Sequence, residues 1–337
     1  MDANRVGDTI SVDGDARQRL YDARGIGRPT GDGTVELTWV EAAYLLERGD
    51  LESVDGMDAT AFLETARDPQ ELARLCVYRD LRERGFYLAT AYPPGGSVDP
   101  LDVVFEVRPR GADPTDDDVA HRVVVLRAST WFTIGALPEA TLAIVDEEAE
   151  VTYATVSRLH PEGETPALPS TTVTGHIAGD RVIVENASTE LYHQSMFGQP
   201  IDGPEGTLWL NLLEARYLVD TDRLNTPDVD VHDHALSVEG AQFDQRYRVY
   251  RALREAGNVP RPGLKFGTDF RVYQAIDSAD DPGHSDLLVE VADPSEWLTP
   301  RMVSRAVRLA NGVRKRHVYA VVEDDSIRWL ALDRLRP

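Results

Sequence analysis

The sequence predicts an α/β (α+β) protein built from two tandem homologous repeats. Its 337 residues suffice for two or more domains of about 150 residues each. Short apolar or alternating stretches typical of strands are interspersed with segments of helical hydrophobic period. Similar blocks also recur in the same order in both halves. Together these features predict mixed sheets packed against helices in each half.

Five blocks define the duplication, at offsets of about 170–177 residues. The clearest is VYRDLRERG (77–85), which returns as VYRALREAG (249–257) with seven identities in nine positions. The other four pair 7–12 with 179–184, Leu20-Tyr21-Gly27 with Leu191-Tyr192-Gly198, 39–51 with 212–224, and 143–159 with 320–335. We therefore predict a first repeat at 1–163, a Pro-bearing linker at 164–171 and a second repeat at 172–337.

The same elements are expected in each half, in the same order. A strand pair comes first, followed by an amphipathic helix and then a second helix that carries the VYRxLRE block. Gly85 and Gly257 are placed to end these second helices. Further strands, a helix and a hairpin around an acidic turn complete the unit. The strands are expected near 103–107, 123–126, 270–273 and 287–291, and the first amphipathic helices near 39–48 and 212–219. Each half thus combines a small N-terminal α/β subdomain with a second, mixed-sheet subdomain.

The composition is strongly acidic. There are 58 Asp and Glu residues against 35 Lys and Arg residues, giving a formal net charge of -23. Lys265 and Lys315 are the only lysines. This balance favours a protein adapted to high salt, where charge repulsion is screened within about 3 Å. Lone Cys76 excludes intrachain disulfides. Neither a signal peptide nor an apolar run of about 20 residues is visible, so we expect a cytoplasmic protein without a membrane span.

Two clusters of basic residues interrupt this acidic background. One cluster lies in the segment 301–317 of the second half. The matching segment of the first half, 129–141, contains no base, and Pro138 aligns with Lys315. Because the chain otherwise disfavours bases, we predict a polyanion-binding face in the second half, with RNA or DNA phosphate as the polyanion. The clusters are Arg246, Arg248, Arg251, Arg254, Arg261, Lys265 and Arg271, and Arg301, Arg305, Arg308, Arg314, Lys315 and Arg316.

Two further titratable residues lie near these clusters. Tyr273 ends the stretch FGTDFRVY, and Glu106 falls at about that place in the first half. His284 opens the predicted strand SDLLVEV. In the first half, His121 lies near the equivalent point. Only the second half therefore combines Tyr, His and Lys.

At these residues the sequence resembles the archaeal tRNA-splicing endonucleases. The resemblance rests on GLKFGTDFRVY (263–273), HSDLLVEV (284–291) and SRAVRLANGVRKRHVYAVVEDD (304–325). The duplication resembles the type in which an inactive and an active unit are fused in one chain. The resemblance implies a nuclease-like catalytic subdomain at about 245–337 and a catalytic triad of Tyr273, His284 and Lys315. The first repeat would be a catalytically inactive structural unit.

The implied reaction is RNA cleavage without a metal or other cofactor. The 2′-OH attacks the adjacent phosphorus, which leaves a 2′,3′-cyclic phosphate and a 5′-OH. His284 can protonate the departing oxygen, and Lys315 can offset charge on the phosphate oxygens. For Tyr273 the residues leave two roles open, general base or orientation of the 2′-OH. DNA lacks this hydroxyl and is not an expected substrate.

The resemblance also implies partners. The substrate would be the bulge–helix–bulge of precursor tRNA, with Arg308 and Trp329 clamping a bulged base. Two cleavage sites and one active unit per chain imply a homodimer. The acidic turn at Asp146, Glu147 and Glu148 would provide the contact between subunits. The remaining residues expected to bind RNA are Arg271, Lys265, Arg301 and Arg305.

Two other functions are compatible with parts of the sequence. A metal-dependent nuclease would use Asp286 and Glu290, but Ala292 stands where such sites need a lysine. The run His232-Asp233-His234 offers metal-ligand types without a third evident partner. A non-catalytic RNA-binding or scaffold subunit would keep the basic face and would not need the Tyr, His and Lys together.

Overall fold

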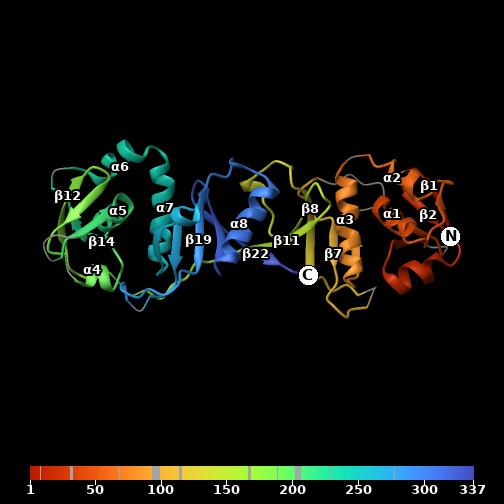
Figure 1. The fold of residues 1–337 in the computed structure, drawn as a ribbon, viewed down its shortest axis with the longest axis horizontal. Helices are drawn as coiled ribbons and strands as arrows, with labels where there is room; N and C mark the ends of the chain where they lie inside the picture. The colour runs from red at the N-terminus through yellow and green to blue at the C-terminus, as the bar shows by residue number, and fades with distance from the viewer. Residues whose placement is uncertain are drawn as a thin grey trace. The chain divides into compact units, whose positions relative to one another are not determined.

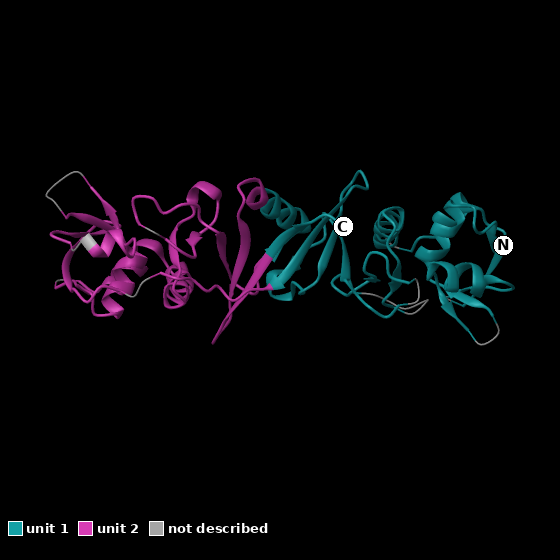
Figure 2. Cartoon of the chain, turned by 90° about the horizontal axis from the view of Figure 1, so that it is seen from below, with its two compact units in different colours: residues 1–157, 297–308, 332–337 teal, residues 158–296, 309–331 magenta. Residues whose placement is uncertain are grey.

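The computed structural model describes the chain except for residues 8, 31–32, 68, 93–98, 114–115, 166–167, 188, 202–205, 228 and 277. The described residues form two compact units, which Figure 2 shows in different colours. Unit 1 comprises 1–157, 297–308 and 332–337, and unit 2 comprises 158–296 and 309–331. The continuous part of unit 1 ends at Ser157, whereas the predicted first repeat extends to 163. Each unit therefore contains most of one predicted repeat, and unit 1 also takes in two short segments of the second.

Both units begin with a five-stranded subdomain of the same topology. The strand order is β3-β4-β2-β1-β5 in unit 1 and β14-β15-β13-β12-β16 in unit 2. In each, an antiparallel hairpin is joined by a short parallel strand at one edge. The elements are β1 (Asp2–Val6), β2 (Thr9–Val12), β3 (Arg28–Pro29), β4 (Val35–Leu37), α1 (Trp39–Glu47), β5 (Ser53–Val54) and α2 (Ala59–Leu63), then β12 (Val173–Ala178), β13 (Arg181–Val184), α4 (Thr189–His193), β14 (Gln199–Pro200), β15 (Leu208–Asn211), α5 (Leu212–Asp220), β16 (Leu224–Asn225) and α6 (Val231–Glu239).

The first helix of each subdomain starts with the same capping device. The Thr38 side chain accepts from the backbone of Glu41, whose carboxylate in turn accepts from the backbone of Thr38. Asn211 and Glu214 repeat this capping box at the start of α5. Such a box satisfies backbone donors that a helix start leaves unpaired. The aligned Glu41 and Glu214 are thus explained by the local structure.

The second subdomain of each half is a mixed sheet with one long helix against it (Figure 1). The strand order is β17-β18-β19-β21-β22 in the second half and β6-β7-β8-β10-β11 in the first. The pairs β19–β21 and β8–β10 are parallel. The elements are α3 (Pro69–Glu83), β6 (Leu88–Thr90), β7 (Phe105–Val107), β8 (His121–Arg127), β9 (Phe132–Thr133), β10 (Thr141–Val145) and β11 (Val151–Arg158), then α7 (Gln242–Glu255), β17 (Val259–Pro262), β18 (Phe270–Tyr273), β19 (Leu287–Ala292), β20 (Trp297–Leu298), α8 (Pro300–Gly312), β21 (Arg316–Val322) and β22 (Ile327–Leu335).

The sequence pattern located most of these elements. Helices α3 and α7 carry the VYRxLRE block, and Gly85 and Gly257 follow them with φ of 85° and 78°. This left-handed backbone suits glycine, so the predicted helix ends are confirmed. One expectation was wrong. The first half has no helix between β8 and β10 comparable to α8, but only a single 3-10 turn at Ile134–Ala136. In the connection 128–140, Phe132–Thr133 form β9, and Gly135 and Pro138 both disfavour a helix.

Aromatic residues of α7 fill the core of unit 2. Tyr250 is 1% exposed and contacts the rings of Tyr217 on α5 and Phe270 on β18. The inward face of β21, from Val318 to Val322, belongs to the same cluster. The core therefore continues from the first subdomain of unit 2 to the sheet of its second subdomain. In the described part of the chain, no helix combines the length and the hydropathy needed to span a membrane.

Residues 163–165, where the predicted linker begins, are hydrogen-bonded to the end of α7. The backbone N–H groups of Gly163 and Thr165 donate to the carbonyls of Ala256 and Gly257. Gly163 and Gly257 approach so closely that a Cβ on either would lie 2.4 Å from the carbonyl oxygen of the other. Of the linker 164–171, residues 166–167 lie outside the described residues. The chain leaving the first half is thus held at the C-terminal end of α7.

Candidate active site

Tyr273 and Lys315 end up on neighbouring strands because of the register of the sheet. Val272 pairs with Leu287, and Leu287 pairs with Arg316. One residue further toward the same edge, Tyr273, Asp286 and Lys315 therefore form a row across β18, β19 and β21. The Asp286 backbone fixes this row, since its N–H donates to Val272 and its carbonyl accepts from Arg316. Adjacent strands lie about 4.8 Å apart, so the backbones of Tyr273 and Lys315 lie roughly 10 Å apart across the sheet.

Tyr273 lies at the buried end of this row. Its side chain is 5% exposed and packs with Val259, Met196 and Ala279. The guanidinium carbon of Arg271 lies 5.9 Å from the centre of its ring. The position of the phenol is thus set by a small apolar cluster, with one cation beside it.

His284 is joined to Lys315 through its neighbour in the chain. The Lys315 Nζ donates to the carbonyl of Ser285 at 2.5 Å. Ser285 is 5% exposed, whereas His284 itself is exposed. The ammonium therefore lies one residue away from an imidazole that is open to solvent. The structure brings the three predicted catalytic residues to one edge of one sheet.

Burial and two neighbouring cations lower the pKa of Lys315. Burial is the main cause of the lowered pKa, and Lys265 and Arg271 act in the same direction. The carboxylate of Asp286 opposes them and raises the pKa of Lys315. Asp286 Oδ2 is fixed by the backbone N–H of Gln274 at 2.9 Å. The sequence assigned Asp286 no part in this site, although its place in the motif HSDLL, opposite the end of FRVY, could have indicated one.

This geometry gives a pH prediction. If the charged form of Lys315 is needed for cleavage, activity is lost as the pH rises through its lowered pKa. Asp286→Asn removes the carboxylate that supports the charge, so the basic limb of the kcat/KM profile should move to lower pH. Measuring kcat/KM across pH for both proteins tests this. A limb that stays in place or moves to higher pH would contradict the assignment, while Asp286→Glu should restore the original position.

Burial removes Arg254 and Arg261 from the predicted polyanion-binding face, which corrects the prediction for these two residues. Arg254 and Arg261 are each 9% exposed, and Arg261 pairs with Glu214 at 2.8 Å. The remaining arginines of this group are taken up by nearby acids or carbonyls: Arg246 by Glu239 and Asp269, Arg248 by the carbonyl of Glu323, and Arg251 by Glu255. The sequence missed these contacts because most of the partners are distant along the chain. Only Lys265 and Arg271 of this cluster lie beside the catalytic row.

The second basic cluster lies on α8 and is exposed. Arg301, Arg305 and Arg308 share one face of the part of α8 that belongs to unit 1. Arg308 donates to the hydroxyl of Thr152 at 2.9 Å. Trp329, in unit 2, is 9% exposed and is part of the apolar core. This burial favours packing over base stacking as the role of Trp329.

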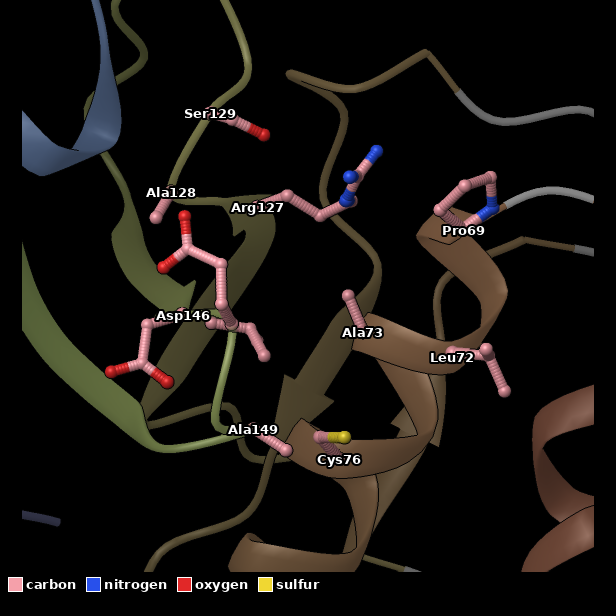
Figure 3. Close-up of a pocket in the computed structure, with 11 residues that line it drawn as sticks. Pro69, Leu72, Ala73, Cys76, Arg127, Ala128, Ser129, Asp146 and Ala149 are labelled. Carbon is pink, nitrogen blue, oxygen red and sulfur yellow. The ribbon is translucent and has the colours of Figure 1, made fainter.

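The acidic turn between β10 and β11 is well formed. Asp146 Oδ1 accepts from the backbone N–H groups of Glu148 and Glu150, and Glu147 forms an exposed ion pair with Arg301 at 2.5 Å. The turn forms one side of a cavity of about 180 Å³, with Cys76 of α3 on the other side (Figure 3). The pKa of the Cys76 thiol is raised by burial.

Among the described residues, one group has metal-ligand types close together: Asp230, His232 and Asp233. Asp230 caps α6 by accepting from the backbone of the other two, and His232 contacts Asp244 at 2.8 Å. His234 instead contacts the carbonyl of Gly179. These polar groups have structural partners at the start of α6.

The alternative metal-dependent nuclease would use Asp286 and Glu290. Burial, together with Glu296 and Asp269, raises the pKa of Glu290 to about 7.

The first half has a different row at the matching edge. The Ala120 N–H donates to the Val107 carbonyl as the Asp286 N–H donates to Val272, so the register of β7, β8 and β10 gives the row Arg108, Ala120 and Pro138. Arg122 and Glu106 lie 3.7 Å apart as an ion pair. By this register Pro138 occupies the place of Lys315, as the sequence alignment predicted, and Arg108 rather than Glu106 occupies that of Tyr273. The phenol and the ammonium are therefore particular to the second half.

A mixed α/β fold with a cation-lined sheet edge defines an enzyme that could act on a polyanion. Comparison with known proteins gives the family. The model for the tRNA intron endonuclease, catalytic C-terminal domain, matches residues 243–329. The model for the N-terminal domain of the same family matches twice, at 1–66 and 173–233. The chain belongs to the tRNA intron endonuclease family and contains its catalytic domain.

Relatives match along the full chain. A protein of Halobacterium salinarum named tRNA-splicing endonuclease is 47% identical over 345 residues, covering 100% of both chains. Proteins of the same name from Natronomonas pharaonis and Methanococcoides burtonii are 45% and 33% identical, covering 97% and 100% of this chain and of each relative. The mostly salt-adapted sources of these relatives agree with the acidic composition.

Proposed function

We propose that this protein excises introns from precursor tRNA as a metal-independent endoribonuclease, cutting both splice sites of a bulge–helix–bulge. The observation that supports this most is the row of Tyr273, Asp286 and Lys315, with His284 two residues before Asp286. All four belong to unit 2, within the matched catalytic domain. We place the enzyme in the cytoplasm, where precursor tRNA is made in cells without a nucleus.

The chemistry follows from the side chains. Tyr273, beside Arg271, contacts and orients the ribose 2′-OH, which gives up its proton to the ionised phenol of Tyr273 or to solvent as it attacks the adjacent phosphorus. Lys315, fixed by the Ser285 carbonyl, stabilises the charge that develops on the non-bridging oxygens. Exposed His284 gives a proton to the departing 5′-oxygen. The P–O bond to the 5′-oxygen breaks as the bond to the 2′-oxygen forms, which leaves a 2′,3′-cyclic phosphate and a 5′-OH.

Recognition of the bulges would involve the exposed arginine face of α8. Arg308 is our candidate for stacking on a bulged base, with Arg301 and Arg305 on neighbouring phosphates. One active unit per chain and two cleavage sites require a homodimer. We assign the acidic turn Asp146–Glu148 to the contact between subunits, in which the exposed carboxylate of Glu147 would exchange its present partner for a base of the other chain.

A chelator-resistance assay tests the reaction. A bulge–helix–bulge RNA is incubated with enzyme and excess EDTA, and the ends of the products are analysed. We expect cutting at two sites, with cyclic phosphate and 5′-OH ends, and no cutting when the two cleavage-site riboses are replaced by 2′-deoxyribose. Loss of cleavage in EDTA would indicate a metal-dependent nuclease. Binding without cleavage under all conditions would indicate the scaffold alternative.

A further inference from the structure

A short turn next to the catalytic row contains Lys265, for which only general RNA binding has been expected so far. It runs from Gly263 to Thr268 and joins β17 to β18. Gly263 donates to the carbonyl of Asp269 and accepts from the N–H of Phe266, and Gly267 completes the turn with φ of 72°. A Cβ on Gly263 would lie 2.5 Å from the hydroxyl of Thr268. The turn is therefore closely folded on its own backbone.

The turn exposes two of its long side chains, Leu264 and Lys265. Leu264 is 88% exposed, more than any other large hydrophobic residue in the described part of the chain. Lys265 is also exposed, and Phe266 is half-buried. Leu264 therefore contributes nothing to the core and leaves an apolar surface next to the charged Lys265.

Both lysines of the chain converge on this turn. The ammonium of Lys265 lies 4.9 Å from the centre of the Phe266 ring, and that of Lys315 lies 5.7 Å from it. All other basic residues of the chain are arginines. Two ammonium groups beside one ring repel each other, and the lowered pKa of Lys315 reports part of this repulsion. Successive phosphates of a nucleic-acid strand would relieve it, because they bring one negative charge to each cation.

We propose that the turn Gly263–Thr268 binds the nucleotide next to the cleaved bond, with Lys265 contacting its phosphate and Leu264 packing against its unpaired base. Phe266 separates the two ammonium groups, so that Lys315 faces the reacting phosphate and Lys265 the neighbouring one. A single-stranded segment fits this surface better than a duplex, since only an unpaired base exposes a face to Leu264. This inference rests on the proposed function, because it places the cleaved phosphate at Lys315.

Binding measurements across a salt series test the proposal. The probe is a bulge–helix–bulge RNA with 2′-deoxyribose at both cleavage sites, and its Kd is measured as a function of KCl concentration. Lys265→Gln should weaken binding and lower the slope of log Kd against log[KCl] by about 0.7, the value for one phosphate contact on a single strand. Leu264→Ser should weaken binding about 3- to 10-fold with an unchanged slope, because it removes apolar contact and no charge.

A matched control removes one exposed positive charge elsewhere in unit 2. Arg181, paired with Asp180 at 2.7 Å on β13, is suitable, and Arg181→Gln should leave both Kd and slope unchanged. Wild-type Kd and slope in Lys265→Gln, or the same change in Arg181→Gln, would overturn the proposal. The cleavage activity of the Lys315→Ala variant distinguishes failure of the proposed function from failure of the role given to the turn. If that variant cuts unmodified RNA normally, the proposed function fails. If it is inactive while Lys265→Gln binds normally, only the role of the turn is wrong.

Discussion

Replacing Lys315 with Ala is expected to slow cleavage of a bulge–helix–bulge RNA by at least about 10²–10³-fold, the usual loss when one preorganised donor to a developing oxyanion is removed. His284→Ala should have an effect of similar size, because the 5′-oxygen then leaves without a positioned acid. The measurement is the single-turnover rate at saturating enzyme, so that weaker binding does not enter the result.

The first half of the chain provides the matched control. His121 is half-buried on β8, and its ring contacts the Thr141 hydroxyl at 3.4 Å. His121→Ala removes the same side chain from the half that lacks the Tyr–Lys row, so it should cleave at the wild-type rate. Circular dichroism and sedimentation should show that all variants remain folded and equally associated. Equal losses in His121→Ala and His284→Ala, or full activity in Lys315→Ala, would refute the assignment.

Local patterns in the sequence predicted much of the fold. The glycines after α3 and α7 were predicted from residues close together in the chain. The capping boxes at α1 and α5, which were not predicted, are equally local. The duplication showed that the elements should repeat in order. By contrast, the connection 128–140 of the first half did not form the expected helix, because part of it forms β9 and it contains Gly135 and Pro138.

The site was predictable to a different extent. The motifs pointed to Tyr273, His284 and Lys315 without a distance between them, and only the register of β18, β19 and β21 brings them to one edge. Asp286 was missed as a neighbour of Lys315 because its relation to that lysine spans two strands. The converse error concerned buried arginines such as Arg254, one of whose partners, the carbonyl of Ser195, is 59 residues away in the sequence. A count of charges along a segment does not reveal which of them are buried.

Replacing Arg261 with Met is expected to lower the free energy of unfolding by about 3–5 kcal/mol, the usual cost of removing one partner of a buried ion pair. Arg261 Nη1 bonds Glu214 at 2.8 Å, and Glu214 is only 2% exposed. The same nitrogen also donates to the carbonyls of Met196 and Gly198, which would lose their donor. Since Met196 packs against Tyr273, this cation also ties the first subdomain of unit 2 to the catalytic strand.

The double variant Arg261→Met/Glu214→Gln distinguishes the cause of this loss. Gln keeps the acceptor that caps α5 but removes the buried charge, so the double variant should unfold at a higher urea concentration than Arg261→Met alone. In the first half, Glu41 at the matching place accepts from the backbone N–H of Gly27. If Arg261→Met unfolds within about 1 kcal/mol of wild type, or if the double variant is no more stable than the single one, the uncompensated Glu214 carboxylate is not what destabilises the fold.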